Sequence, residues 1–277
     1  MEVEGSPLYA VLHDAVPGRP EAPVIVHVHA LGVEQITLYR QEVLAARGAT
    51  ALGFPVLRYH ARGHGDSAGS SADVTLSSLV TDARAAADEA KRRSGRARVV
   101  WLGVRLGALV AAIAGGPSSG RGDAAGFVLW EPAAKPADFF RQQLRTLLFS
   151  RVAGGLKPDA TVDQLLVRLE QEGSLDVLGY SLQRSLVRSF DGASLEAALA
   201  GCRAPVLLAQ IEARARLAPA HAALVGSLNA PPAAGGERAT VSTALVREEP
   251  GYQLMSNPAW SSDDLTRVTT EWLDALA

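Results

Sequence analysis

Cysteine is nearly absent from the sequence, because Cys202 is the only one in 277 residues. A single thiol cannot form a disulfide within the chain, and no cysteine cluster remains that could hold zinc or an iron–sulfur centre. We therefore expect no metal and no cofactor. The simplest role for Cys202 is that of a small buried hydrophobic side chain, which suits a protein in a reducing compartment.

The sequence also lacks an excess of charge and long hydrophobic runs. The net charge of −2 provides no field that would attract nucleic acid, and no basic stripe appears along the chain. Every long apolar run is broken by a charge, glycine or proline before it reaches membrane-spanning length, and the first residues include Glu2 and Glu4. These absences predict a cytoplasmic protein without a nucleic-acid partner or a membrane span. A homodimer is compatible with them.

Short apolar runs alternate with segments of helical spacing through the first half of the chain. Such strand-to-helix units, joined by right-handed crossovers, predict a parallel sheet with helices packed against it. The chain is long enough for one large α/β domain with an insertion. The units are a strand over 23–29 with a helix over 35–47 closed by Gly48, a strand before Gly63 with a helix over 76–91, and a strand over 97–102 with a helix to about 114.

The second half contains an interruption of this alternation. A buried strand is expected over 126–130, but the stretch 136–200 has helical spacing and no comparable strand run. Regular elements return with a strand over 204–210, a helix over 219–228, a strand over 239–247 and a closing helix from about 262. We therefore predict a core formed by residues 1–135 and 201–277, with residues 136–200 inserted as a helical cap.

A glycine-bracketed turn follows the third predicted strand. Residues 103–107 read Gly-Val-Arg-Leu-Gly between that strand and an alanine-rich helix. A strand that passes through Gly-x-X-x-Gly into a helix forms a sharp, strained turn that lifts residue X above the sheet, and the glycines let helix and strand approach closely. Residue X is Arg105 in this chain.

With this turn, the chain resembles the α/β-hydrolase superfamily along nearly its whole length. The resemblance implies an α/β-hydrolase fold, a mainly parallel twisted sheet with helices on both faces and a helical cap insertion. Within the superfamily the chain looks most similar to the second type of hydrolase associated with the exosortase system, whose elbow also tends to carry arginine. The segments that carry the resemblance are His-Ala-Leu-Gly at 29–32, the glycine-rich turn at 59–67, the elbow at 101–107, and the segments 128–132 and 177–182.

The family's catalytic triad does not carry over to this sequence. Arg105 stands where the family places its nucleophilic serine, and a guanidinium stays protonated and cannot attack a carbonyl. After the strand that should precede the acid, the only carboxylate is Glu212, about two residues too early. The last loop, 250–255, contains no histidine, and none follows His221. The resemblance therefore implies a degenerate Ser-His-Asp triad.

The candidate site residues lie at the predicted carboxyl edge of the sheet, where open α/β sheets bind ligands. Arg105 can hold an anion bidentately, or it can form a buried ion pair with Glu131 at the end of the neighbouring strand. Glu34 begins the first crossover helix, where an acidic side chain favours the helix dipole. The candidates for catalysis are Arg105, Glu131, Glu34, His29 and His60, and those for ligand binding are Arg105, His29, Leu31 and Leu106.

Two functions are compatible with these residues, and both have a small molecule as partner. In the first, a repurposed hydrolase fold binds a small acyl-bearing or anionic ligand without serine-type hydrolysis. In the second, an atypical hydrolase of esters, thioesters or amides uses a relocated glutamate or histidine to activate water, while Arg105 stabilises the oxyanion. Fold alone does not decide between them.

Overall fold

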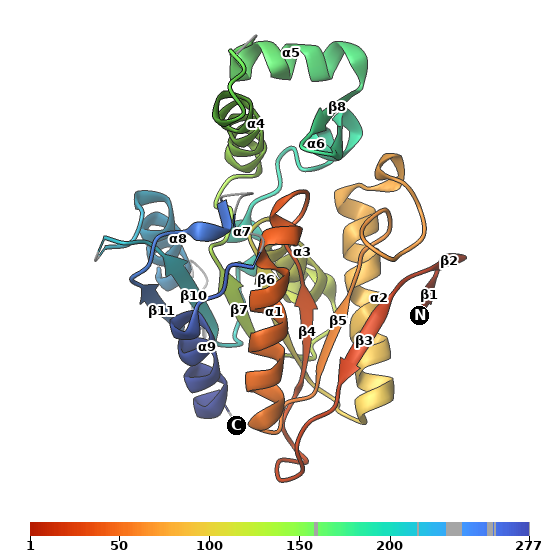
Figure 1. Ribbon diagram of the computed structural model, residues 1–277. Helices are drawn as coiled ribbons and strands as arrows, with labels where there is room; N and C mark the ends of the chain where they lie inside the picture. Colours follow the sequence, from red (N-terminus) through yellow and green to blue (C-terminus); the bar gives the residue numbers. More distant parts are fainter. Residues whose placement is uncertain (158–159, 215, 231–239, 254–256, 258, 277) are drawn as a thin grey trace.

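The computed structural model describes residues 1–157, 160–214, 216–230, 240–253, 257 and 259–276. Within them, a seven-stranded sheet has the order β11-β10-β7-β6-β4-β5-β3 (Figure 1). All neighbouring strands pair in parallel except β3, which runs antiparallel to β5 at one edge. The strands are β3 (Ala10–His13), β4 (Val24–Val28), β5 (Val56–Tyr59), β6 (Val99–Val104), β7 (Ala124–Trp130), β10 (Val206–Ile211) and β11 (Val241–Val246). The predicted α/β-hydrolase sheet is confirmed.

Helices cover both faces of this sheet, because successive side chains of each central strand point in opposite directions. On β4, Val24 and Val26 pack into the core beneath α2 and α3, whereas Ile25 packs with α1 and α9. Helix α8 packs on the α2 and α3 side through Leu224. The helices are α1 (Glu34–Ala51), α2 (Leu76–Ser94), α3 (Gly107–Gly115), α8 (Pro219–Asn229) and α9 (Asp263–Leu276).

The predicted end of the first crossover helix is wrong. Helix α1 continues through Gly48 to Ala51, and the chain reverses at Gly53, whose φ is +90°. A Cβ added at Gly48 would lie 3.1 Å from the Thr270 methyl and 3.2 Å from the Thr266 methyl. Gly48 therefore allows α1 to approach α9 closely, and it does not terminate the helix.

The segment between β7 and β10 is not wholly helical, so that part of the prediction for residues 136–200 is also wrong. It contains α4 (Pro136–Ala153), α5 (Val162–Glu172), β8 (Ser174–Val177), β9 (Tyr180–Gln183), α6 (Arg184–Ser189) and α7 (Leu195–Leu199). Strands β8 and β9 form an antiparallel hairpin outside the main sheet. Leu178 and Gly179 both have positive φ, as a two-residue hairpin turn requires. Helices α4, α5 and α6 lie beyond the carboxyl ends of the parallel strands (Figure 1).

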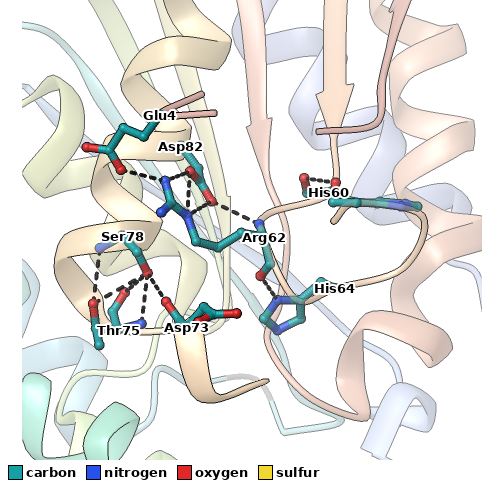
Figure 2. Close-up of polar contacts among 9 residues, drawn as sticks. Glu4, His60, Arg62, His64, Asp73, Thr75, Ser78 and Asp82 are labelled. Carbon is teal, nitrogen blue, oxygen red and sulfur yellow. Dashed lines mark hydrogen bonds and ion pairs between the residues drawn. The ribbon is translucent and has the colours of Figure 1, made fainter. Parts of the chain in front are cut away.

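The loop after β5 is fixed by a buried carboxylate on α2. Asp82 is fully buried and accepts hydrogen bonds from the backbone nitrogen of Arg62 at 2.9 Å and from its Nη2 at 2.7 Å (Figure 2). Arg62 Nη2 also donates to Glu4, which lies in the turn between β1 (Glu2–Val3) and β2 (Ser6–Pro7). The carbonyl oxygen of Arg62 accepts from His64 Nδ1 at 3.0 Å. This network holds the loop that carries His60 and His64.

Three further short helical turns complete the described elements: η1 (Ser71–Asp73), η2 (Pro117–Ser119) and η3 (Gly251–Gln253). In the part of the chain that the structure describes, no helix combines the length and apolar character needed to cross a membrane.

Candidate functional site

Arg105 occupies a left-handed turn between β6 and α3, as the glycine bracketing predicts. Its φ is +55°, a conformation that costs a non-glycine residue about 1–2 kcal/mol. The turn requires its glycines, because a Cβ at Gly107 would lie 2.2 Å from the His29 carbonyl oxygen, and one at Gly103 would lie 2.5 Å from the Ala108 Cα. The predicted strained elbow is therefore confirmed.

The Arg105 guanidinium is buried and almost fully hydrogen-bonded. Its Nε donates to Glu34 Oε2 at 3.0 Å, and Nη2 donates to Glu34 Oε1 at 3.3 Å and to Gln142 Oε1 at 2.8 Å. Nη1 donates to the carbonyl oxygen of Glu131 at 3.0 Å. These contacts join the elbow to α1, β7 and α4.

The predicted approach of Arg105 to Glu131 is confirmed, but Glu34 is the closer partner. Glu131 Oε2 lies 3.9 Å from Arg105 Nη1. The Glu131 carboxylate is also held by the Ile211 backbone nitrogen and by the Tyr252 hydroxyl, the latter at 3.2 Å. Burial raises the pKa of Glu131, although Arg105 opposes that shift. For the Arg105 guanidinium, burial lowers the pKa, but the charges of Glu34 and Glu131, the Tyr252 side chain and the hydrogen bond to Glu34 together more than offset it, so the group stays charged.

The charges around Arg105 do not form an anion site in this conformation. One guanidinium faces the two carboxylates of Glu34 and Glu131, and the rings of Phe139 and Tyr252 lie 5.9 and 5.6 Å from its Cζ. The apolar space beside the elbow is nearly filled, with a cavity of about 10 Å³, room for roughly one water molecule. Its walls are Leu31, Gly32, Phe139, Phe140, Gln143, Val177, Tyr180, Leu182 and Leu186.

The other ligand-binding candidates from the sequence do not all lie in one place around Arg105. Leu31 lines the small apolar space, whereas Leu106 is fully buried at the start of α3. His29 is also buried, and among the described residues neither of its ring nitrogens has a hydrogen-bond partner. Its ring centroid lies 5.5 Å from that of His60, which lines a second and larger cavity.

Beside His29 lies a buried polar cluster that the sequence reasoning missed. The Glu42 Oε2 atom of α1 lies 3.5 Å from Arg58 Nη2, 3.8 Å from His29 Nδ1 and 3.9 Å from His27 Nδ1. Burial raises the pKa of Glu42 to about 7, although Arg58 opposes the shift, and burial lowers the pKa of both histidines. The alternation of His27 and His29 within an apolar strand was the available sequence signal.

The positions that supply the acid and the base in hydrolases contain no such pair here. Glu212 is half-buried, and its Oε1 accepts from the backbone nitrogen of Arg214. His221 is buried on α8, where its ring nitrogens contact Gln210 Oε1 at 2.7 Å and the Pro132 carbonyl oxygen at 2.8 Å. In the last loop, Leu254 and Met255 lie outside the described residues. No group of three His, Cys, Asp or Glu side chains in the described ranges is arranged to hold a metal ion.

The sheet order, the elbow turn and the position of the inserted segment define this protein as an α/β hydrolase by fold. A family model for serine aminopeptidases of the S33 type matches residues 19–191, more than half of the chain, so the chain belongs to this family. A search of curated protein sequences gave no match.

Solved structures with the same fold match nearly the full length of the chain. Est1E from Butyrivibrio proteoclasticus, with ferulic acid bound, is 20% identical with a TM-score of 0.67, covering 98% of this chain and 96% of that one. A putative hydrolase from Agrobacterium vitis is 18% identical with a TM-score of 0.61, covering 98% and 93%. The enol-lactonase from Burkholderia xenovorans is 19% identical with a TM-score of 0.56, covering 98% of both chains. At these identities the similarity shows the fold alone.

Proposed function

We propose that this S33-family protein binds a small acyl-bearing ligand and carries out no serine-type hydrolysis. The observation that carries the proposal is the state of the elbow, where a charged, buried guanidinium takes the place of the nucleophile and is hydrogen-bonded to Glu34, Gln142 and the Glu131 carbonyl. An arginine neither attacks a carbonyl nor accepts a proton near neutral pH. The degenerate triad belongs to this proposal.

The charges around Arg105 favour an uncharged acyl group over an anion. An anionic ligand would have to displace Glu34 or Gln142 from the guanidinium, and it would then lie beside the remaining carboxylates. An uncharged acyl chain also needs the space of about 10 Å³ to be enlarged by movement of α4, but it leaves the Arg105–Glu34 ion pair in place. It then gains by contact with apolar walls such as Phe139, Phe140 and Leu182. The anionic alternative of the sequence analysis therefore has less support.

The segment 136–200 takes the role of a cap in this proposal. Gln142 Oε1 of α4 accepts a hydrogen bond from Arg105 Nη2, so the segment is attached to the elbow turn. Displacement of α4 would break that hydrogen bond and enlarge the small space beside the elbow. Similarity to the exosortase-associated hydrolases stays a prediction at the level of the subgroup.

One observation favours the alternative function, an atypical hydrolase. The raised pKa of Glu131 moves this carboxylate toward the range of a general base. Both of its oxygens, however, already accept hydrogen bonds, from the Ile211 nitrogen and the Tyr252 hydroxyl. A water activated by Glu131 would have to compete with these donors.

The two functions differ in turnover. We would incubate the purified protein with p-nitrophenyl butyrate and with a serine-directed fluorophosphonate, and measure binding of the uncharged aliphatic amide butyramide by calorimetry. The proposal expects binding of the amide, no fluorophosphonate labelling and no hydrolysis above the buffer rate. Labelling of a serine would contradict the lost nucleophile. Hydrolysis that Glu131→Gln abolishes would establish the alternative.

A further inference from the structure

A second cavity, of about 610 Å³, adjoins the small apolar space, because Gly32 and Tyr180 line both. It opens between the first turns of α1, the loop after β5 and the turn between β8 and β9, and Arg105 is not among its lining residues. Its volume falls in the range of sites for drug-sized molecules, about 300–1,000 Å³. The side chains that matter for the argument are Ile36, Tyr39, His60, His64 and Tyr180.

The walls of this cavity are uncharged and rich in flat rings. None of the residues lining it in the described part of the chain is Asp, Glu, Lys or Arg. Two tyrosines and two histidines contribute rings, and the His64 and Tyr180 rings lie 5.7 Å apart at an angle of 31°. Ile36 and Tyr39 are partly exposed on α1 although both are large and apolar. Such walls favour a planar, uncharged ligand that stacks against rings.

The hydrogen bonds of the loop fix which histidine atom can bind a ligand. The backbone nitrogen of Asp66 donates to His60 Nδ1 at 3.0 Å, so this atom carries no proton. Burial lowers the pKa of His60, so the ring is neutral near pH 7 and carries its proton on Nε2. No hydrogen-bond partner of Nε2 occurs among the residues that the structure describes. The cavity therefore has a hydrogen-bond donor available at His60.

The second histidine of the cavity has the opposite tautomer. His64 Nδ1 lies 3.0 Å from the carbonyl oxygen of Arg62, which can only accept, so Nδ1 carries the proton. Its Nε2 therefore accepts, and it faces the Tyr180 hydroxyl at 3.5 Å. Tyr180 belongs to the inserted segment, so this contact holds the β8–β9 turn over the cavity.

We propose that this cavity binds an uncharged aromatic molecule that carries a carbonyl or similar acceptor, which accepts a hydrogen bond from His60 Nε2. The aromatic part lies against Tyr39 and Tyr180, and Ile36 covers its outer side. The inference goes beyond the proposed function and does not depend on it, because Arg105 does not line this cavity.

The experiment uses the full chain and prodan, an uncharged naphthalene that carries a ketone and whose fluorescence shifts to the blue in an apolar site. We expect saturable binding of one prodan per chain. Ile36→Trp fills the outer side of the cavity and should weaken binding at least tenfold. Val167→Trp on α5 is the matched control, because Val167 and Ile36 are equally exposed at 56% and Val167 does not line the cavity. It should bind prodan as the parent does. Equal affinity for both variants, or no saturable binding by the parent, would overturn the proposal.

The hydrogen bond from His60 is tested with a second probe that lacks the ketone. In His60→Asn, the side-chain amide oxygen can still accept the hydrogen bond from the Asp66 backbone nitrogen. The shorter side chain has no donor at the position of His60 Nε2. We expect prodan affinity to fall about tenfold, the scale of one lost hydrogen bond, and N-phenyl-1-naphthylamine affinity to change far less. An equal loss for both probes would show that His60 only shapes the cavity. None of these readouts involves ester turnover, so hydrolysis at the elbow would contradict the proposed function while leaving this result in place.

Discussion

Arg105 and Glu34 form a buried ion pair across 71 residues of sequence, with Nε and Oε2 at 3.0 Å. Arg105 lies at the turn after β6, and Glu34 begins α1, which leaves the sheet after the neighbouring strand β4. Each member of the pair replaces the hydrogen bonds that water would give the other. The pair therefore stabilises the fold only when both members are present. It also explains why a cation is tolerated at this buried turn.

Loss of one member of this pair should strongly destabilise the protein. Glu34→Gln removes the closer of the two carboxylates that face the buried Arg105 guanidinium, and we expect the free energy of unfolding to fall by about 3–5 kcal/mol. Urea unfolding followed by circular dichroism measures the change. The double variant Glu34→Gln/Arg105→Gln should lose less than the sum of the two single variants, because each single variant leaves the other member of the pair without its partner and the double variant leaves neither. Loss of Arg105 affects Glu131 alike in Arg105→Gln and in the double variant.

The control for this prediction is an exposed ion pair. Arg267 contacts Asp264 and Glu271 on α9, and its side chain is 54% exposed. Replacement of Arg267 by glutamine should leave the unfolding midpoint almost unchanged, because water and salt screen such pairs. A similar loss for Arg267→Gln and Glu34→Gln would contradict the idea that burial makes the elbow pair important.

Much of the fold follows from local sequence patterns. The apolar strands β4, β6, β7 and β10 and the helices that follow them were predictable, because a strand buried on both faces needs an unbroken apolar run. The hairpin at 174–183 was not, because its strands are four residues each and carry polar positions such as Asp176. The edge strand β3 was missed for a similar reason. Gly48 was misread because its role depends on contact with α9, which local sequence does not show.

The site was less predictable than the fold. The glycine bracket identified Arg105 and its strained turn, and the strand order suggested Glu131 as a neighbour. Glu34 was considered for the helix dipole, but its contact with Arg105 depends on the exact course of the loop from β4 into α1. Gln142 could not be found because it comes from the inserted segment, whose placement over the sheet is a long-range property. The cavity at His60 could not be predicted for the same reason, since Tyr180 of the inserted segment forms one wall.

A methyl group at the second elbow glycine should also destabilise the fold. In Gly107→Ala, the added Cβ would lie 2.2 Å from the carbonyl oxygen of His29, a backbone atom that cannot move without shifting β4. We expect the free energy of unfolding to fall by about 3 kcal/mol or more, at the upper end of the cost of overpacking.

The matched control is Gly226→Ala in α8, where an added Cβ meets no atom within 4 Å. It should gain roughly 0.5–1 kcal/mol from the higher helix propensity of alanine. Equal effects of the two variants in urea unfolding would argue against close packing at the elbow.

The buried Glu42 predicts a dependence of stability on pH. Burial raises its pKa from an ordinary value of 4.5 to about 7. Between these two pH values, the folded protein therefore holds a proton that the unfolded chain has released. The stability from this proton is fully present below about pH 4.5, and it is lost as the pH rises toward 7. The groups facing Glu42 are Arg58 from β5 and His27 and His29 from β4.

Glu42→Gln isolates this contribution, because glutamine does not titrate. Between pH 5 and 7.5, the parent should lose stability relative to the variant, by at most about 3 kcal/mol for a pKa shift of this size. The histidines contribute in the opposite direction, since burial lowers their pKa values, and this burial is common to both proteins. Urea midpoints at a series of pH values test the sign. A difference that is constant with pH, or one that grows in favour of the parent, would mean that Glu42 is ionised in the folded protein.

A serine restored at the elbow should not restore hydrolysis. Arg105→Ser places a hydroxyl at the turn, but activation of that hydroxyl requires a base oriented by an acid. The last histidine of the chain, His221, has its ring nitrogens committed to Gln210 and the Pro132 carbonyl oxygen. In the last loop, the Tyr252 hydroxyl faces Glu131 and offers no base of suitable pKa, because burial raises the pKa of that phenol. We therefore expect p-nitrophenyl butyrate turnover by Arg105→Ser to equal that of the parent and of Arg105→Ala, each shown to be folded by circular dichroism. Turnover by Arg105→Ser above both would show that a base within reach of the elbow exists and that the triad is not degenerate.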